Sequence, residues 1–224
     1  MKKLILAALS ALMILALSGC GGGGDVNVNA PPVFVTTILS DPVFDGDIVQ
    51  DLTGVRTITQ GMSPTVQSVF AGIDPVTGEE FRAFLDFSLT GANGVPGNAI
   101  IESAFLDIVI NNIIPLPLIG TIPLRIDLVS FQPPNLVGTD FDRTFQPALA
   151  TITVNPPISQ ADFGRHVTID VTPLMVEAQR LGLLDFQVRI MEDLGIVTPG
   201  LIEINDTTGV NRSTLAPALD VTYF

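Results

Sequence analysis

Residues Phe81–Leu89 read FRAFLDFSL and residues Ala99–Asn111 read AIIESAFLDIVIN, with a loop rich in Gly and Pro between them. In each arm, apolar side chains alternate with more polar ones. Successive side chains of a β-strand point to opposite faces, so each arm should have one apolar face and one wetter face. Two such arms joined by a short loop predict an antiparallel hairpin whose apolar face packs against a second sheet.

The same two-residue period recurs along the chain, most clearly in Leu124–Leu128, Leu184–Ile190 and Leu219–Tyr223. It is interrupted at Thr172-Pro173, where Thr suits a helix N-cap and Pro suits the first helical turn. We therefore predict one short helix near residues 173–181. About ten short strands separated by turn signals, with no alternating helices, predict an all-β fold: an antiparallel β-sandwich of the jelly-roll type.

Three stretches are expected to connect strands rather than to form central ones. Residues 41–51 are acidic and contain Gly, and residues 133–146 are mostly polar. Residues 113–123 read IIPLPLIGTIP, and proline cannot donate to a β-ladder, so this stretch is an edge or a loop. It either folds back over an open end of the sandwich or offers an apolar contact surface to a partner or to lipid. The candidate contact residues here are Ile114, Leu116 and Leu118.

The N-terminus reads as a targeting signal. Two lysines precede the apolar run Leu4–Ala16, which is too short to span a bilayer comfortably. The next four residues, Leu17-Ser18-Gly19-Cys20, resemble a bacterial lipobox, whose Cys is acylated and becomes the first residue. We therefore expect a signal peptide over residues 1–19 and a lipidated Cys20, with palmitate among its acyl chains. A flexible Gly-rich tether over residues 20–30 and one β-sandwich domain over residues 31–224 should follow.

The residue after Cys20 is Gly rather than Asp. In bacteria with two membranes, this resembles the pattern of lipoproteins sent to the outer membrane. The expected location is therefore the cell envelope. The pattern favours the outer membrane, on either its periplasmic or its outer surface.

Charge and composition exclude several classes of function. Beyond the two lysines of the leader, the chain has eight arginines against 23 acidic residues, a net charge of −15. Nucleic-acid binding needs a basic surface, so we expect no nucleic-acid partner. The single cysteine rules out a disulfide within the chain and zinc sites built on Cys pairs. One His and no Trp leave few options for catalysis or for stacking on sugars.

Several segments together resemble the DNRLRE-type jelly-roll domains, relatives of a disaggregatase-associated carbohydrate-binding module. The segments that carry this resemblance are Arg82–Leu89, Ser103–Ile108, Ile169–Thr172 and Pro217–Tyr223, in the order found in that family. The resemblance implies a jelly-roll fold over most of the chain after the tether. It also implies a possible role in binding an extracellular or envelope polysaccharide.

Candidate chemistry is sparse. His166 is the one histidine, and it shares a strand face with Thr168 and Asp170. To act as a base or a metal ligand, it would need partner side chains from other elements. An exposed histidine on a strand is the simpler interpretation. Asp45 and Asp47 offer oxygen ligands for a structural calcium ion, although acidic turns are usually only solvated. Other acidic residues considered were Asp140 with Asp142 for calcium, and Glu79-Glu80 with Asp162 as a carboxylate pair for glycoside hydrolysis.

Phe84, Phe105 and Phe131 have the opposite phase to their core-facing neighbours. They either form an aromatic patch for a partner on the outside of one sheet or pack beneath loops, which we favour. Together these observations predict a lipid-anchored, non-enzymatic envelope protein whose β-sandwich binds or assembles, with an envelope protein or a glycan as its partner. The alternative is a carbohydrate-binding module.

Overall fold

The computed structural model describes residues 31–61, 67–114, 120–131, 135–193 and 199–224. The predicted signal peptide, Cys20, Leu116 and Leu118 lie outside these residues. The chain divides into two units, Met1–Pro32 and Val33–Phe224, and the second contains every element given below. Among the described residues, no helix is long and apolar enough to cross a membrane.

The second unit is an all-β antiparallel sandwich, as predicted, with 47% of the described residues in strands and 11% in helices. Its elements follow in chain order: β1 (Phe34–Leu39), β2 (Gly46–Gln50), β3 (Arg56–Gln60), β4 (Ser68–Ile73), β5 (Glu80–Ser88), β6 (Ile101–Ile114), β7 (Thr121–Ile122), β8 (Leu124–Val129), η1 (Gly138–Phe141), β9 (Ala150–Thr153), β10 (Ile158–Ser159), η2 (Gln160–Asp162), β11 (His166–Asp170), α2 (Thr172–Arg180), β12 (Asp185–Glu192), β13 (Leu201–Asn205), α3 (Arg212–Leu215) and β14 (Ala218–Tyr223).

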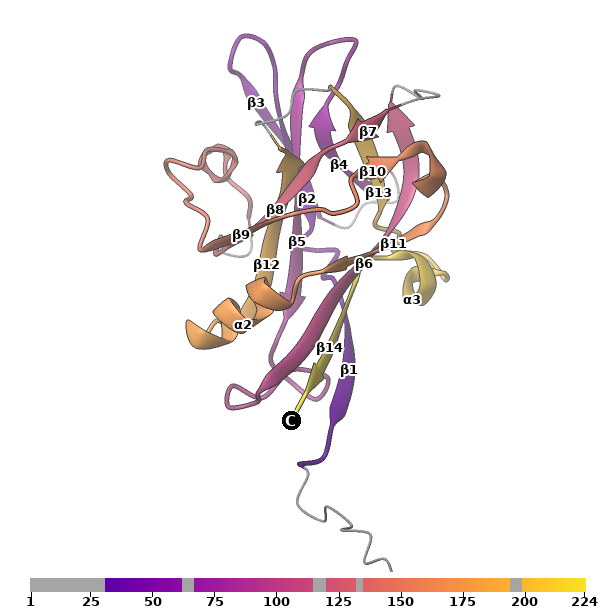
Figure 1. Ribbon diagram of the computed structural model, residues 1–224. Coiled ribbons are helices and arrows are strands. Elements are labelled where there is room, and N and C mark those ends of the chain that lie inside the picture. Colours follow the sequence, from indigo (N-terminus) through magenta and orange to yellow (C-terminus); the bar gives the residue numbers. More distant parts are fainter. Residues whose placement is uncertain (1–30, 62–66, 115–119, 132–134, 194–198) are drawn as a thin grey trace, which may run out of the picture. The chain divides into compact units, whose positions relative to one another are not determined.

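Twelve of the described strands form one large sheet that curls over its own core, and β7 pairs with β10 in a separate two-stranded sheet. The order of the large sheet is β1-β14-β6-β13-β4-β5-β12-β8-β9, with β11 added beside β6, β2 beside β5 and β3 beside β2 (Figure 1). Side chains from both halves meet in the main core, among them Leu85 and Phe186 from one half and Leu106 and Leu219 from the other. The two halves therefore act as the two layers of a sandwich.

The predicted hairpin between the two organising arms is wrong. β5 pairs with β12, β2 and β4, whereas β6 pairs with β14, β11 and β13. The arms thus lie in different halves of the curled sheet. The connection over residues 89–100 is much longer than the two to five residues of a usual hairpin, so it can cross between layers.

The alternation predicted the inward-facing side chains correctly. Leu85, Phe87 and Val188 are fully buried, as are Leu106 and Ile108 on the facing half. Burial of these apolar side chains away from water makes the dominant favourable contribution to the stability of the fold.

The predicted short helix is present as α2, which packs Leu174, Met175 and Ala178 into the core. Thr172 is not its N-cap, because that position is Val171. The Thr172 hydroxyl instead accepts a hydrogen bond from the Ala104 N–H at 2.9 Å, which attaches the start of the helix to β6.

Residues 41–51 are not only a connection, because they contain β2. This strand pairs with β3 on one side and β5 on the other, and Ile48 at its centre is fully buried. The acidic residues around Ile48 led to the prediction of a connection rather than a strand, because Asp is usually depleted in strands and common in turns.

A second apolar cluster lies outside the main core, on the other face of the β2-β5-β12-β8 layer. It contains Phe84, Val129 and Phe131 together with Leu136 and Phe141 from the long connection before β9. The rings of Phe84 and Phe131 meet edge to face, with centroids 5.8 Å apart. This connection therefore covers the outer face of the layer, and side chains of outward phase become buried beneath it.

Candidate functional site: an arginine-rich cluster on the outer face of the sheet

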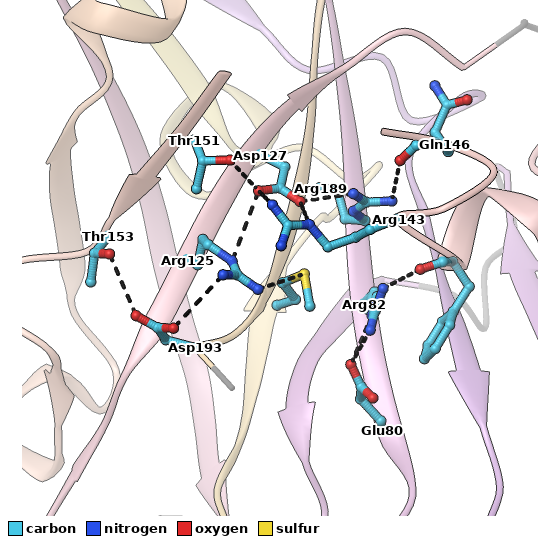
Figure 2. Close-up of polar contacts among 12 residues, drawn as sticks. Glu80, Arg82, Arg125, Asp127, Arg143, Gln146, Thr151, Thr153, Arg189 and Asp193 are labelled. Atoms are coloured by element: carbon cyan, nitrogen blue, oxygen red, sulfur yellow. Dashed lines mark hydrogen bonds and ion pairs between the residues drawn. The ribbon is translucent and has the colours of Figure 1, made fainter. Parts of the chain in front are cut away.

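A fully buried ion pair lies at the centre of the covered face. Arg189 on β12 and Asp127 on β8 are register partners, and neither side chain has any exposure. Nη2 of Arg189 donates to Oδ2 of Asp127 at 2.7 Å, and its Nη1 donates to the backbone oxygens of Asp140 and Gln146 at 2.7 and 3.2 Å. Its Nε–H has no partner among the described residues. The guanidinium thus joins the sheet to the connection above it (Figure 2).

Asp127 gathers further donors around it. Nε of Arg143 lies 3.0 Å from its Oδ2, and the Thr151 hydroxyl donates to its Oδ1 at 2.8 Å. Arg125, on the same strand, lies at 3.9 Å from both Asp127 and Asp193 (Figure 2). One carboxylate therefore faces three guanidinium groups, which is the arrangement expected when buried charge has to be balanced inside the protein.

A second ion pair lies beside this group on β5. Nε and Nη2 of Arg82 contact Oε1 of Glu80 at 2.8 and 2.6 Å, and Nη1 donates to the backbone oxygen of Phe141. The Phe141 ring lies between two cations, with the guanidinium carbon of Arg82 3.9 Å and that of Arg56 4.9 Å from the ring centroid. Cation–π attraction of this kind is strongest where water is excluded.

These residues border an open cavity of about 300 Å³, which also includes Arg143. Its wall mixes donors and acceptors: Arg56 donates to the Gln50 side chain at 2.8 Å and lies 3.6 Å from Asp142. A guanidinium has five N–H groups, so Arg56 and Arg143 keep donors beyond those used here. Chemically, the cavity can offer several hydrogen bonds to a polar or anionic molecule.

Burial and pairing set the ionisation of the cluster. Burial lowers the pKa of Arg189, whereas the hydrogen bond to Asp127 and the negative charge of Asp127 act to raise it. The N–H of Thr144 is the main cause of a lowered pKa at Asp142, with a smaller contribution from the charge of Arg56. On the same strand as Arg189, Glu192 has its pKa raised by burial to about 7.

The sequence reasoning missed this cluster. Five of the eight arginines belong to it, and these are Arg56, Arg82, Arg125, Arg143 and Arg189. The signal that could have found it is the outward phase shared by Arg82 and Phe84. A large apolar side chain of outward phase indicates that other parts of the chain cover this outer face. Charged side chains buried on such a face need partners of opposite charge.

The two predicted calcium ligands are buried rather than solvated. Oδ1 of Asp45 accepts the Asp86 N–H at 2.8 Å, and Oδ2 of Asp47 accepts the Phe70 N–H at 3.2 Å. Burial, and next the charge of Asp206, raise the pKa of Asp45 well above its usual range, and burial raises that of Asp47 to about 7. Within the described ranges, no group of three acidic or histidine side chains could hold a metal ion. The calcium site stays a prediction.

The other acidic residues considered have separate partners. Oδ2 of Asp140 accepts the Val137 N–H at 2.8 Å, and Oδ2 of Asp162 accepts the Ser159 N–H at 2.7 Å. Glu79 accepts from the Thr77 hydroxyl at 3.0 Å. Their contacts describe turns and helix starts rather than a carboxylate pair.

The predicted partner surface is corrected at Phe84, which is fully buried in the second cluster. Packing beneath a loop, the favoured interpretation, is confirmed for Phe84 and Phe131. Phe105 is exposed on β6, in the other half of the sheet, and Ile114 at the end of β6 is half-buried. Phe84 and Phe105 therefore do not share one patch.

His166 lies on an exposed strand position, as expected. Its Nδ1 is 2.7 Å from Oδ2 of Asp107, on the neighbouring strand. The structure thus gives the histidine one acidic partner on an open face of β11.

No protein-family model matches this chain, and no curated protein matches it. The resemblance to DNRLRE-type domains therefore stays a prediction from the sequence.

Proposed function

We propose that this protein is a lipid-anchored component of the bacterial cell envelope whose β-sandwich is a non-enzymatic binding or structural module. The observation that carries the proposal is the segment Leu17–Cys20, placed directly after the apolar run Leu4–Ala16. An acylated N-terminal Cys with two or three chains anchors a protein firmly, because each buried methylene contributes about 0.8 kcal/mol.

The arrangement of charges supports a role in binding or architecture rather than catalysis. Glu80, Asp127 and Asp142 each face a guanidinium group at 2.6 to 3.6 Å. A carboxylate that already contacts a guanidinium has its oxygen atoms engaged in charge-assisted contacts within the protein. Asp127 is well suited to holding the connection before β9 in place, and the partly exposed Glu80 and Asp142 are suited to presenting a polar surface.

The anchor is tested by replacing Cys20 with Ala in the full chain and expressing both forms in a diderm bacterium. The wild type should incorporate an alkyne-labelled palmitate analogue and partition into the detergent phase. The C20A variant should do neither, because it lacks the thiol that is acylated. Label on the variant, or none on a wild type that is expressed, would refute the anchor.

The cavity beside Phe141 favours one second candidate, a carbohydrate-binding module. Its wall combines Arg56, Gln50, Glu80 and Asp142, whose planar polar groups can each bind a pair of sugar hydroxyls. The net charge of −15 disfavours acidic glycans over most of the protein surface, but the arginines of the cavity wall could still bind an acidic group. We therefore propose an envelope or extracellular polysaccharide, neutral or acidic, as the ligand class.

A glycan array tests this candidate with matched arginine variants. Arg143→Ala removes a partly exposed guanidinium from the cavity wall, whereas Arg180→Ala removes an exposed one from α2. Binding that is lost in R143A and kept in R180A would support the cavity. Retention of a glycan by both variants alike, or by neither the wild type nor the variants, would count against it.

A further inference from the structure

One end of the sandwich exposes apolar side chains from three neighbouring strand ends. Val33 and Val35 lie at the start of β1, and Ile100 lies just before β6; Val35 is 72% and Ile100 68% exposed. The backbone groups of Ile100 and Phe224 exchange hydrogen bonds of 3.2 and 3.0 Å, so these strand ends are direct neighbours. Figure 1 shows the C-terminus beside the start of β1 at this end of the fold.

The exposed apolar side chains at this end adjoin residues that pack against the main core. The half-exposed ring of Phe34 stacks on Tyr223, with centroids 5.7 Å apart and an angle of 24° between the planes. Tyr223 and Ile101 are register partners, and both pack against the main core. The Thr36 hydroxyl also donates to the backbone oxygen of Asn93 at 2.8 Å, which joins β1 to the loop before β6.

No charged side chain occurs in residues 33–37, 89–101 or 221–224, which we name the apolar end. The opposite end differs: the turn between β4 and β5 carries Asp74 and Glu79 around the exposed Val76. Because β5 runs the length of its layer between that turn and the loop 89–100, the two ends lie about 30 Å apart. Charged side chains border the apolar end but lie outside its three segments: Arg180 lines a cavity with Ile100, and Glu102 is exposed on β6.

The apolar end is also where the chain leaves the fold toward Cys20. Twelve residues lie between Cys20 and Val33, and the thirteen steps along this chain span at most about 45 Å. An acylated Cys20 would keep the apolar end within this distance of the lipid. Apolar side chains without charge gain by entering the boundary between headgroups and acyl chains, whereas acidic surfaces are repelled by anionic lipid.

We infer that the apolar end rests on the lipid bilayer, with Val35 and Ile100 at the headgroup boundary and the turn that carries Asp74 and Glu79 directed away from it. This inference rests on the proposed lipid anchor. It adds a second, weaker contact with the membrane, which fixes how the sandwich is oriented on the surface.

The absence of Trp from the chain makes a direct test possible. Single tryptophans are introduced into the full lipidated protein as Ile100→Trp or as the control Val76→Trp, both at exposed positions; Val76 is 85% exposed. The proteins are incorporated into phosphatidylcholine–phosphatidylethanolamine vesicles with or without brominated acyl chains. In I100W, bromine should quench about half of the emission or more, since interfacial groups sit within roughly 5–10 Å of the acyl boundary. V76W should stay unquenched.

Flotation with the vesicles is scored first, and it separates the two proposals. Protein that does not float refutes the lipid anchor and this inference with it. Protein that floats but shows equal quenching in I100W and V76W refutes the orientation alone. A blue-shifted I100W emission that bromine does not quench would mean that another protein surface, such as a second copy, covers the apolar end, and this also overturns the inference. Val35→Trp repeats the measurement should I100W misfold.

Discussion

Replacing Asp127 with Ala should destabilise the sandwich far more than breaking an ion pair of similar length on its surface. Asp127 is fully buried and lies 2.7 Å from Arg189 and 3.0 Å from Arg143, and it accepts the Thr151 hydroxyl at 2.8 Å. The substitution leaves the guanidinium of Arg189 buried without its counter-charge. Removing one partner of a buried pair typically costs about 3–5 kcal/mol, because the remaining charge has lost both its water and its partner.

The magnitude is large compared with the whole stability of a domain, which is about 5–15 kcal/mol. The matched control is Glu177→Ala, which breaks the 2.6 Å pair between Glu177 and Arg180 on the surface of α2. Solvent screens that pair, so its loss should leave stability nearly unchanged. The two variants thus compare ion pairs of similar length at different burial.

The assay is urea unfolding followed by far-ultraviolet circular dichroism, since the chain has no Trp to report by fluorescence. The D127A midpoint should fall well below that of wild type, and the E177A midpoint should match it. The double variant Asp127→Leu with Arg189→Met should recover part of the loss relative to D127L, because it removes both charges. Equal midpoints for D127A and E177A would refute the view that the buried cluster attaches the connection to the sheet.

Three further predictions use the same unfolding assay. Burial raises the pKa of Asp47 to about 7 in the fold, whereas the pKa is about 4 in the unfolded chain. The free energy of unfolding should therefore fall as pH rises from about 4 to about 7, by at most about 4 kcal/mol from this group. Asp47→Asn should flatten this dependence of the midpoint on pH, and an unchanged slope would contradict the raised pKa. Phe186→Ala should cost about 3–5 kcal/mol as a core truncation, whereas the exposed Phe145→Ala should cost almost nothing; similar losses would contradict the core. His166→Ala should leave the midpoint nearly unchanged, and a large drop would show that its contact with Asp107 is structural.

The fold class could be predicted from the sequence because alternation reports which side chains share a face. Leu85, Phe87 and Leu106 have the phase that the sequence indicated, and all three are buried. Alternation does not report which strands are neighbours. Pairing depends on contacts between distant segments, so β5 and β6 were wrongly expected to pair with each other.

The candidate site could not be predicted, because it depends on what covers the outer face. Arg189 looks like an ordinary outward-facing charge in the sequence, and it is buried only because the connection before β9 folds over it. The acidic residues near Ile48 misled for a related reason. Asp45 and Asp47 suggest a solvated turn, whereas Asp45 directly precedes β2 and Asp47 lies within it, and burial raises the pKa of both.

The most direct test of the central proposal is the intact mass of the mature protein purified from bacterial membranes. We expect a chain that begins at Cys20, with a diacylglyceryl group on its sulfur and, in a diderm host, a further acyl chain on its amino group. A mature chain that begins at any other residue, or an unmodified Cys20, would contradict it.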